Sequence, residues 1–179
     1  MSQPDIDQQP PPSSDHQAPI QQPSSSGFRI PLHSSSTTFP PQDLTGPPPC
    51  YDIDGSPMYF GSAIFDKSVH PCKIGPYLRD PCSVPLGGRE VTHNGRYDLL
   101  PFDPDTMEFV TTSYGFIPSG RRPVEGGYEE DGMPLYHSVA MFNNIRIPGK
   151  TSLRLAGCNV TFNGGEHVVK TNYEILCWK

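Results

Sequence analysis

Two pairs of charged residues have types and spacing that could bind a polar ligand. Asp52 precedes Lys73 by 21 positions, and Glu129 precedes Lys150 by the same 21 positions. A carboxylate accepts hydrogen bonds from neighbouring hydroxyls, and an ammonium donates to a ring or hydroxyl oxygen. A neutral sugar needs this combination. Each pair is therefore either a sugar site or a surface salt bridge, which would be worth at most about 1 kcal/mol.

The two pairs lie in an internal repeat. When the sequence is shifted by 77 positions, residues 51–59 align with residues 128–136 without a gap. Twelve identities fall in the 38 positions from 51 to 88, whereas roughly two or three would arise by chance. After one deletion, residues 97–100 align with residues 173–176. The sequence therefore contains two copies of one unit.

The start of the chain differs in composition from these repeats. Residues 1–49 hold 12 of the 23 prolines and many glutamines and serines. Such a segment cannot bury enough apolar area to offset the entropy lost on ordering. We therefore expect a disordered Pro/Gln/Ser-rich arm at 1–37, a first repeat at 38–101, a connection at 102–114 and a second repeat at 115–179.

Glycine and proline recur about every ten residues, which excludes long helices. Aromatic and apolar runs entered through Asp-Gly turns predict strands at 58–65 and 135–142. Residues 91–100 predict a hairpin with its turn at 93–95, and residues 168–178 predict a terminal strand. We therefore expect an all-β fold of two tandem pseudo-symmetric repeats, whose small antiparallel sheets pack face to face around one core.

The composition excludes several classes of protein. The formal net charge is −6, so we expect no attraction to nucleic acid or anionic lipid. No apolar run approaches roughly 18 residues, so we expect no membrane insertion. The N-terminus lacks the basic and apolar regions of a secretory signal, and the five cysteines are an odd number. Both features predict reduced thiols and a cytoplasmic location.

The sequence does not predict catalysis or metal binding. It contains no GxSxG, HExxH, Walker A, GxGxxG or CxxC motif, and its six histidines do not align across the repeat. The segment Asp52-Ile53-Asp54-Gly55 resembles the start of a calcium loop but lacks the later ligands, so Asp54 and Asp131 are interpreted as turn residues. A carbohydrate enzyme would need Asp52 and Glu129 in one site, which the pseudo-symmetry disfavours. We expect no enzyme, no metal and no cofactor.

The order and spacing of these residues resemble the DM9 repeat over residues 38–179. The second repeat shows the pattern more fully, as Gly126-Gly127-Tyr128-Glu129, Asp131-Gly132, Tyr136, Pro148-Gly149-Lys150, Gly164-Gly165-Glu166 and Tyr173-Glu174-Ile175-Leu176. The first repeat shows a weaker version, as Tyr51-Asp52-Ile53-Asp54-Gly55, Tyr59, Lys73, Gly87-Gly88-Arg89-Glu90 and Tyr97-Asp98-Leu99-Leu100.

This resemblance implies an all-β pseudo-symmetric fold, frequent homodimers and cytosolic proteins of immune recognition. It also implies sugar binding, as in mannose-specific DM9 lectins and the lectin-like part of natterin-type proteins. When the mannose-binding residues of these lectins are placed on this sequence by the resemblance, they are Asp52 with Lys73 and Glu129 with Lys150. Cys72 stands where the pattern has a glycine before the lysine, and it would be strained if that position has positive φ.

Two functions remain open from the sequence. The first is a non-catalytic, mannose-type carbohydrate-binding module with one acid–lysine site per repeat, acting on mannose-containing glycans as a homodimer. The alternative is a protein-interaction adaptor or scaffold whose proline-rich arm recruits a polyproline-binding partner. Pro48-Pro49-Cys50-Tyr51 fits a motif that WW domains bind, although Tyr51 also aligns with Tyr128 as a repeat position.

Overall fold

The computed structural model describes residues 25–36 and 38–179. Residues 1–24 and 37 of the predicted disordered arm lie outside the described residues. Within the described ranges the chain is mostly strand and turn, with one helix of four residues, α1 (Gln42–Thr45). No helix in this part of the chain is long and apolar enough to cross a membrane.

The two halves of the chain contain strands in the same order. The first half contains β1 (Ile30–His33), β2 (Cys50–Tyr51), β3 (Pro57–Ile64), β4 (Val69–Ile74), β5 (Cys82–Leu86), β6 (Arg89–Thr92) and β7 (Arg96–Leu100). The second half contains β8 (Met107–Thr112), β9 (Arg122–Pro123), β10 (Glu125–Tyr128), β11 (Pro134–Phe142), β12 (Ile145–Ser152), β13 (Gly157–Phe162), β14 (Gly165–Val169) and β15 (Tyr173–Trp178). Apart from the additional β9, each strand of the second half has a counterpart in the first.

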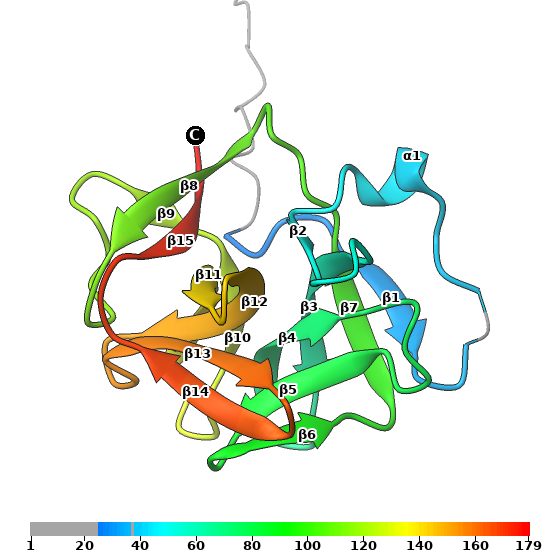
Figure 1. The fold of residues 1–179 in the computed structure, drawn as a ribbon. Coiled ribbons are helices and arrows are strands. Elements are labelled where there is room, and N and C mark those ends of the chain that lie inside the picture. The colour runs from blue at the N-terminus through cyan, green and yellow to red at the C-terminus, as the bar shows by residue number, and fades with distance from the viewer. Residues whose placement is uncertain (1–24, 37) are drawn as a thin grey trace, which may run out of the picture.

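Strand pairing establishes this correspondence. In the first half β3 pairs with β2, β4 and β7, and β7 also pairs with β1. In the second half β11 pairs with β10, β12 and β15, and β15 also pairs with β8. The halves join where β6 meets β14 and where β10 meets β4 (Figure 1). The predicted all-β fold of two pseudo-symmetric repeats is confirmed.

Two of the predicted strand arrangements are wrong. The turn at 93–95 joins β6 to β7, but β6 pairs with β5 and β14, whereas β7 pairs with β1 and β3. The predicted terminal strand at 168–178 is two strands, β14 and β15, separated by a bend in which Asn172 has a φ of 54°. In each repeat the last strand, β7 or β15, instead pairs along an edge of β3 or β11. The turn residues therefore indicated where strands end but not which strands pair.

Two strands lie outside the predicted boundaries of the repeats. Strand β1 falls in the predicted arm at 1–37, and β8 falls in the predicted connection at 102–114. Each pairs with the last strand of its repeat, along an edge that would otherwise expose unpaired amides. Ile30 and Leu32 pack against the core of the first repeat. The prediction of disorder is therefore wrong for Ile30–His33, whose apolar side chains offset the cost of ordering.

Three hairpins close through two-residue turns. Both residues have positive φ in Gly87–Gly88 (62° and 80°), Asn143–Asn144 (48° and 61°) and Asn163–Gly164 (48° and 79°). Such turns match the twist of antiparallel strands and favour glycine and asparagine. The tip at Gly87–Gly88 thus corresponds to Asn163–Gly164, one position earlier than the sequence alignment predicted. This correction brings Glu90 into register with Glu166.

The buried apolar side chains form two clusters rather than the single core that was predicted. One cluster draws on both repeats and includes Phe60, Val139 and Leu176. The other lies within the first repeat and includes Tyr59 and Leu99. Successive residues of a strand point to opposite faces of a sheet, so β3 contributes Tyr59 to one cluster and Phe60 to the other. The sheet of the first repeat is therefore covered on both faces.

A partly buried arginine just before β1 links the two repeats. The Arg29 guanidinium donates to Ser62 Oγ (3.1 Å) in the first repeat, and to the Glu125 carbonyl (2.7 Å) and His137 Nε2 (3.0 Å) in the second. Burial lowers the pKa of Arg29 to about 10, while the charge of Asp98 opposes the shift, so the side chain stays cationic at neutral pH. This contact fixes the N-terminal segment across the boundary between the repeats.

We expect the substitution Arg29→Met to lower the free energy of unfolding by about 2–3 kcal/mol, because it leaves buried acceptors in both repeats without a donor. Denaturation with guanidinium, followed by the fluorescence of Trp178, measures this change. Arg79 is exposed, so Arg79→Met is the matched control and should change stability by less than about 0.5 kcal/mol. A wild-type midpoint for Arg29→Met would contradict the linking role.

Candidate functional site

The first predicted pair lies at the boundary between the two repeats. Asp52 and Lys73 line a cavity of about 320 Å³ together with Glu90. These three residues are called the first site. Part of the opposite wall comes from the second repeat, including Ile145 and Phe162. The structure therefore brings the predicted acid and lysine to one cavity, and the cavity is complete only when both repeats are present.

Strand pairing fixes the direction of Lys73. On β4 this residue lies opposite Phe60 of β3 and opposite Ser83 of β5. Its neighbours Cys72 and Ile74 point into the core of the first repeat, so the lysine projects from the other face of the sheet. The side chain is 12% exposed. Its aliphatic stem is therefore buried while its ammonium reaches the cavity.

Glu90 is the direct partner of Lys73. The Lys73 Nζ donates to Glu90 Oε1 at 3.2 Å, and the Gly164 N–H donates to Oε2 at 2.9 Å. Burial raises the pKa of Glu90, but the charge of Lys73 and the hydrogen bonds from Gly164, Lys73 and Ser83 outweigh burial and hold the pKa below its usual value. The first site thus contains an ionised carboxylate in contact with an ammonium.

Asp52 lies in the turn between β2 and β3. Its Oδ1 accepts a hydrogen bond from the Ile53 N–H at 2.7 Å, and its Oδ2 accepts one from the Tyr77 hydroxyl at 2.5 Å. Lys73 is paired with Glu90 rather than with Asp52. Because each carboxylate oxygen has two lone pairs, Asp52 retains acceptor capacity for a ligand in the cavity.

The two Asp-Gly turns form as predicted. Asp54 Oδ1 accepts from the Ser56 N–H at 2.9 Å, and Asp131 Oδ1 accepts from the Met133 N–H at 3.1 Å. The glycine after each aspartate has a φ of 82° or 83°, a conformation that favours glycine. These turns fix the position of the acid that lies two residues earlier in each repeat.

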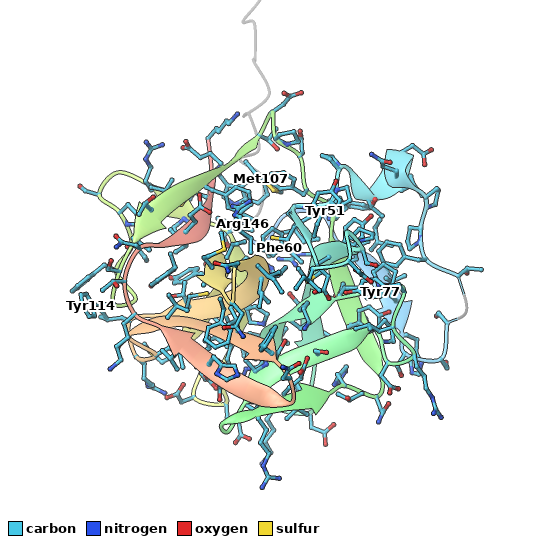
Figure 2. All side chains as sticks on the ribbon, viewed as in Figure 1. Tyr51, Phe60, Tyr77, Met107, Tyr114 and Arg146 are labelled. Carbon is cyan, nitrogen blue, oxygen red and sulfur yellow. The ribbon has the colours of Figure 1, made fainter. Side chains whose placement is uncertain are left out.

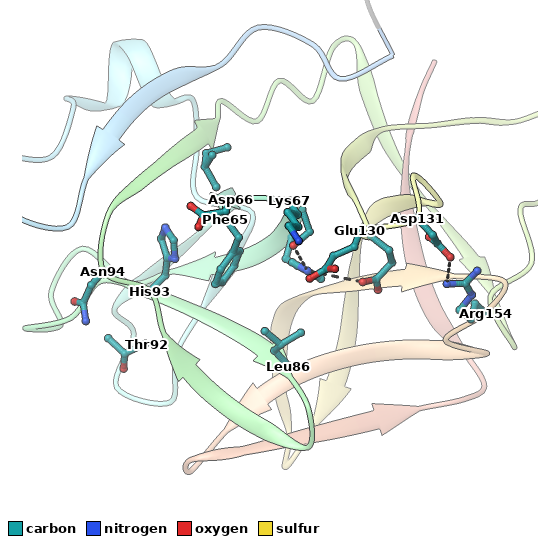
Figure 3. Close-up of a pocket in the computed structure, with 14 residues that line it drawn as sticks. Phe65, Asp66, Lys67, Leu86, Thr92, His93, Asn94, Glu130, Asp131 and Arg154 are labelled. Carbon is teal, nitrogen blue, oxygen red and sulfur yellow. Dashed lines mark hydrogen bonds and ion pairs between the residues drawn. The ribbon is translucent and has the colours of Figure 1, made fainter.

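The second predicted pair is arranged differently. Glu129 and His70 line a cavity of about 1010 Å³ between loops of both repeats (Figure 3). Lys150 lies beneath this cavity and is 2% exposed, with its Nζ 3.2 Å from His70 Nδ1. The His70 Nε2 lies 3.1 Å from Ser68 Oγ and 3.8 Å from Glu129 Oε2. Glu129, His70, Lys150 and Glu166 are called the second site. In this site a histidine lies between the acid Glu129 and the lysine.

Burial determines the protonation of the second site. Burial, and to a smaller extent the charge of Lys150, lower the pKa of His70 to about 4 against the opposing effect of Glu166. Burial also lowers the pKa of Lys150, and the charges of Glu166 and Glu129 oppose that shift. His70 is therefore neutral at physiological pH. Its Nδ1 accepts from Lys150, and its Nε2–H is the donor directed to Ser68 and Glu129.

A reciprocal contact between two hairpin tips connects the sites. Glu90 accepts a hydrogen bond from the Gly164 N–H of the second repeat, and Glu166 Oε2 accepts one from the Gly88 N–H of the first repeat at 2.6 Å. The other oxygen of Glu166 accepts from Asn159 Nδ2 at 2.7 Å. Each glutamate therefore bonds at once to its own repeat and to the other repeat.

Glu90, Glu166 and His70 were not predicted from the sequence as site residues. The two glutamates had a signal, because both follow the hairpin tip and align once the second tip is shifted by one position. His70 had no such signal, because Ile147 occupies the corresponding position in the second repeat. Comparing the two repeats identifies residues that both copies share. It therefore does not point to His70, which is present in the first repeat alone.

The expected strain at Cys72 is absent. The corresponding residue of the second repeat, Gly149, does not have positive φ. A Cβ atom there would instead lie 2.4 Å from the Asn159 carbonyl oxygen, so close packing rather than backbone conformation requires glycine. All five cysteines are free and buried, with Cys72 Sγ 3.4 Å from Cys82 Sγ. Among the described residues, no cluster of three or more His, Cys, Asp or Glu could hold a metal ion.

Comparisons with known proteins agree with this arrangement of repeats. The family model of the DM9 repeat matches residues 52–169, which include both predicted pairs. Among seven matching chains of solved structures, the crystal structure of the nematode sperm cell motility protein MFP2B is 14% identical and has a TM-score of 0.61. The match covers 85% of this chain and 46% of that chain, so this chain spans less than half of that protein's length. No curated protein sequence matches the chain.

We expect His70 to make the protein less stable as the pH falls from about 6.5 toward 4. Its pKa is about 4 in the folded protein and about 6.5 in an unfolded chain. The unfolded chain therefore binds the extra proton in this window, and stability is lost as the pH falls through it. The variant His70→Gln keeps an acceptor for Lys150 but does not titrate, so it should lose less stability between pH 7 and pH 5.

Guanidinium unfolding at both pH values tests this expectation. His137 is also buried with a lowered pKa, but it is common to every variant and cancels in the comparison. His33 is exposed, so His33→Gln is the control and should keep the wild-type pH dependence. The role of His70 is refuted if His70→Gln shows that dependence as well.

Proposed function

Because the chain belongs to the DM9 repeat family, we propose that it is a non-catalytic carbohydrate-binding module of the mannose type. The supporting observation is the first site, where Asp52, Lys73 and Glu90 line one cavity. Ionised carboxylates accept hydrogen bonds from adjacent sugar hydroxyls, and the ammonium donates to a hydroxyl or ring oxygen. The cavity, at about 320 Å³, lies at the lower end of the range for small-molecule sites, about 300–1,000 Å³.

The groups of the first site are ordered before a ligand arrives. Glu90 is held by the Gly164 amide and by Lys73, and Asp52 is held by the Tyr77 hydroxyl. An ammonium has three donors, and one of those on Lys73 is used by Glu90. The remaining donors can turn toward a sugar without breaking that contact. Such preorganisation reduces the entropy lost on binding.

The second site presents a different surface to a ligand. Lys150 is buried under His70, so the cavity offers the Glu129 carboxylate and a neutral imidazole in place of a carboxylate and an ammonium. We assign the stronger sugar binding to the first site and weaker binding to the second. In a homodimer the four sites could engage one multivalent glycan, and avidity would then compensate for affinities of about millimolar.

The protonation states favour binding over glycoside hydrolysis. Hydrolysis requires a carboxylic acid with a raised pKa next to a second carboxylate. The pKa of Glu90 is instead held below its usual value, where burial is outweighed by Lys73 and by hydrogen bonds. Asp52 and Glu129 line separate cavities and so do not form a carboxylate pair. These features fit a module that holds a sugar without cleaving it.

Calorimetry of the full chain with mannose and with mannan tests the proposal. We expect Lys73→Met to weaken binding at least about tenfold, because it removes the ammonium and keeps the buried stem. Asp52→Asn should also weaken binding, because it removes the charge from an exposed turn without opening a cavity. Glu129→Gln, in the second site, should have a smaller effect than either.

The matched control is Lys170→Met, because the Lys170 side chain is exposed and lies outside both sites. Its sugar affinity should equal that of the wild type. If the wild-type chain releases no heat with either mannose or mannan, the carbohydrate-binding function is wrong. If Lys73→Met and Asp52→Asn both bind normally, the function stands but the site is elsewhere.

A further inference from the structure

A second hollow adjoins the first site on the side of β2. It has a volume of about 600 Å³ and lies between residues 49–53 and the hairpin that joins β11 to β12. Asp52, Ile53 and Ile145 line both this hollow and the cavity of the first site. The two spaces are therefore neighbours across a single wall. We call the new one the adjoining hollow.

The lining of the adjoining hollow combines apolar faces with amide groups. Tyr51 is 54% exposed and Met141 is 55% exposed, although both side chains are apolar over most of their surface. Asn143 and Asn144 are exposed at the tip of the hairpin. An aromatic ring can stack against the C–H face of a sugar ring, and amides both donate to and accept from hydroxyls. This lining suits a neutral pyranose.

The backbone on both sides of the hollow is constrained by a tight turn and by strand pairing. Asn143 and Asn144 form a two-residue turn with φ values of 48° and 61°, closed by the pairing of Phe142 with Ile145. The backbone of Tyr51 is held by its pairing with Pro57 in the β2–β3 ladder. Figure 2 shows Tyr51 and Arg146 on either side of the boundary between the repeats. A surface formed by such constrained turns loses little entropy on binding.

Arg146 does not offer a free charge to a ligand in the hollow. Its Nη2 donates to Glu174 Oε2 at 2.5 Å, and its guanidinium lies 4.9 Å from the centre of the Phe109 ring. The charge is therefore neutralised within the second repeat. A ligand in this hollow meets mainly neutral groups, apart from Asp52 at the wall shared with the first site.

The other repeat provides a comparison within the same molecule. The residues that correspond to Asn143 and Asn144 are Asp66 and Lys67, which line the cavity of the second site. Figure 3 shows these two residues in the same cavity as Glu130 and Asp131. The turn beside the adjoining hollow is thus neutral, whereas the corresponding turn of the other repeat carries two charged residues. The difference indicates that the extension beside the first site suits an uncharged ligand.

We infer that the first site binds an oligosaccharide rather than a single sugar. One ring is held by Asp52, Lys73 and Glu90, and the next ring lies in the adjoining hollow between Tyr51 and the Asn143–Asn144 turn. This inference rests on the proposed carbohydrate-binding function and extends it to the size of the ligand. An oligosaccharide would occupy both the first site and the adjoining hollow, whereas a monosaccharide would occupy the first site alone.

Calorimetry of the full chain with mannose and with α-linked mannotriose tests the inference. The trisaccharide should bind about fivefold to tenfold more tightly than mannose, which corresponds to about 1–1.4 kcal/mol. Tyr51→Ala should lower the trisaccharide affinity to that of mannose and leave mannose binding unchanged. Asn144→Asp keeps a residue that tolerates positive φ and should weaken trisaccharide binding alone.

Tyr128→Ala is the matched control, because Tyr128 corresponds to Tyr51, is 47% exposed and lies outside both hollows. It should bind both sugars as the wild type does. Equal wild-type affinities for the two sugars, or equal weakening of both by Tyr51→Ala, would overturn the inference and leave the proposed function intact. Absence of binding by either sugar would overturn both.

Discussion

The two repeats are held in register by a reciprocal pair of hydrogen bonds at their hairpin tips, and both candidate sites depend on this contact. Glu90 accepts from the Gly164 amide, and Glu166 accepts from the Gly88 amide. Bonds to a carboxylate are charge-assisted and stronger than neutral ones. Each tip is also a tight turn that presents its amide outward. The contact therefore places a wall from one repeat against the acid and lysine of the other, which forms the cavity of the first site.

The same framework produces two unequal sites because the facing walls differ by a few side chains. The wall residue Ile147 of the first site is apolar, and Lys73 reaches the cavity beside it. The corresponding wall residue of the second site is His70, which accepts a hydrogen bond from Lys150 and covers it. Pseudo-symmetry of the backbone thus does not imply symmetry of binding. One repeat can hold a neutral ligand while the other contributes stability that depends on pH.

The sequence predicted the architecture better than it predicted the contacts. The repeat, the Asp-Gly turns and the cavity shared by Asp52 and Lys73 could all be inferred from spacing, because local turn chemistry and a matched offset determine them. The partners of β6 and β7, the strand at Ile30–His33 and the position of His70 could not be inferred. These depend on how distant edges and faces meet, which local residue patterns and spacing along the chain do not reveal. Glu90 could have been inferred in part, because its counterpart Glu166 aligns with it only after a one-residue shift at the hairpin turn.

The central claim is that the first site, formed where the two repeats meet, binds the sugar. The most direct test is a two-dimensional NMR titration of the full chain with mannotriose, following the backbone amides. If the sugar occupies the first site and the adjoining hollow, the amide chemical shifts should change at Asp52–Ile53, around Lys73 and Glu90, and at Asn143–Asn144. The amides around Glu129 should respond only at higher sugar concentration. Changes confined to the second site, or a titration that leaves the amides around Lys73 and Glu90 unmoved, would contradict the claim.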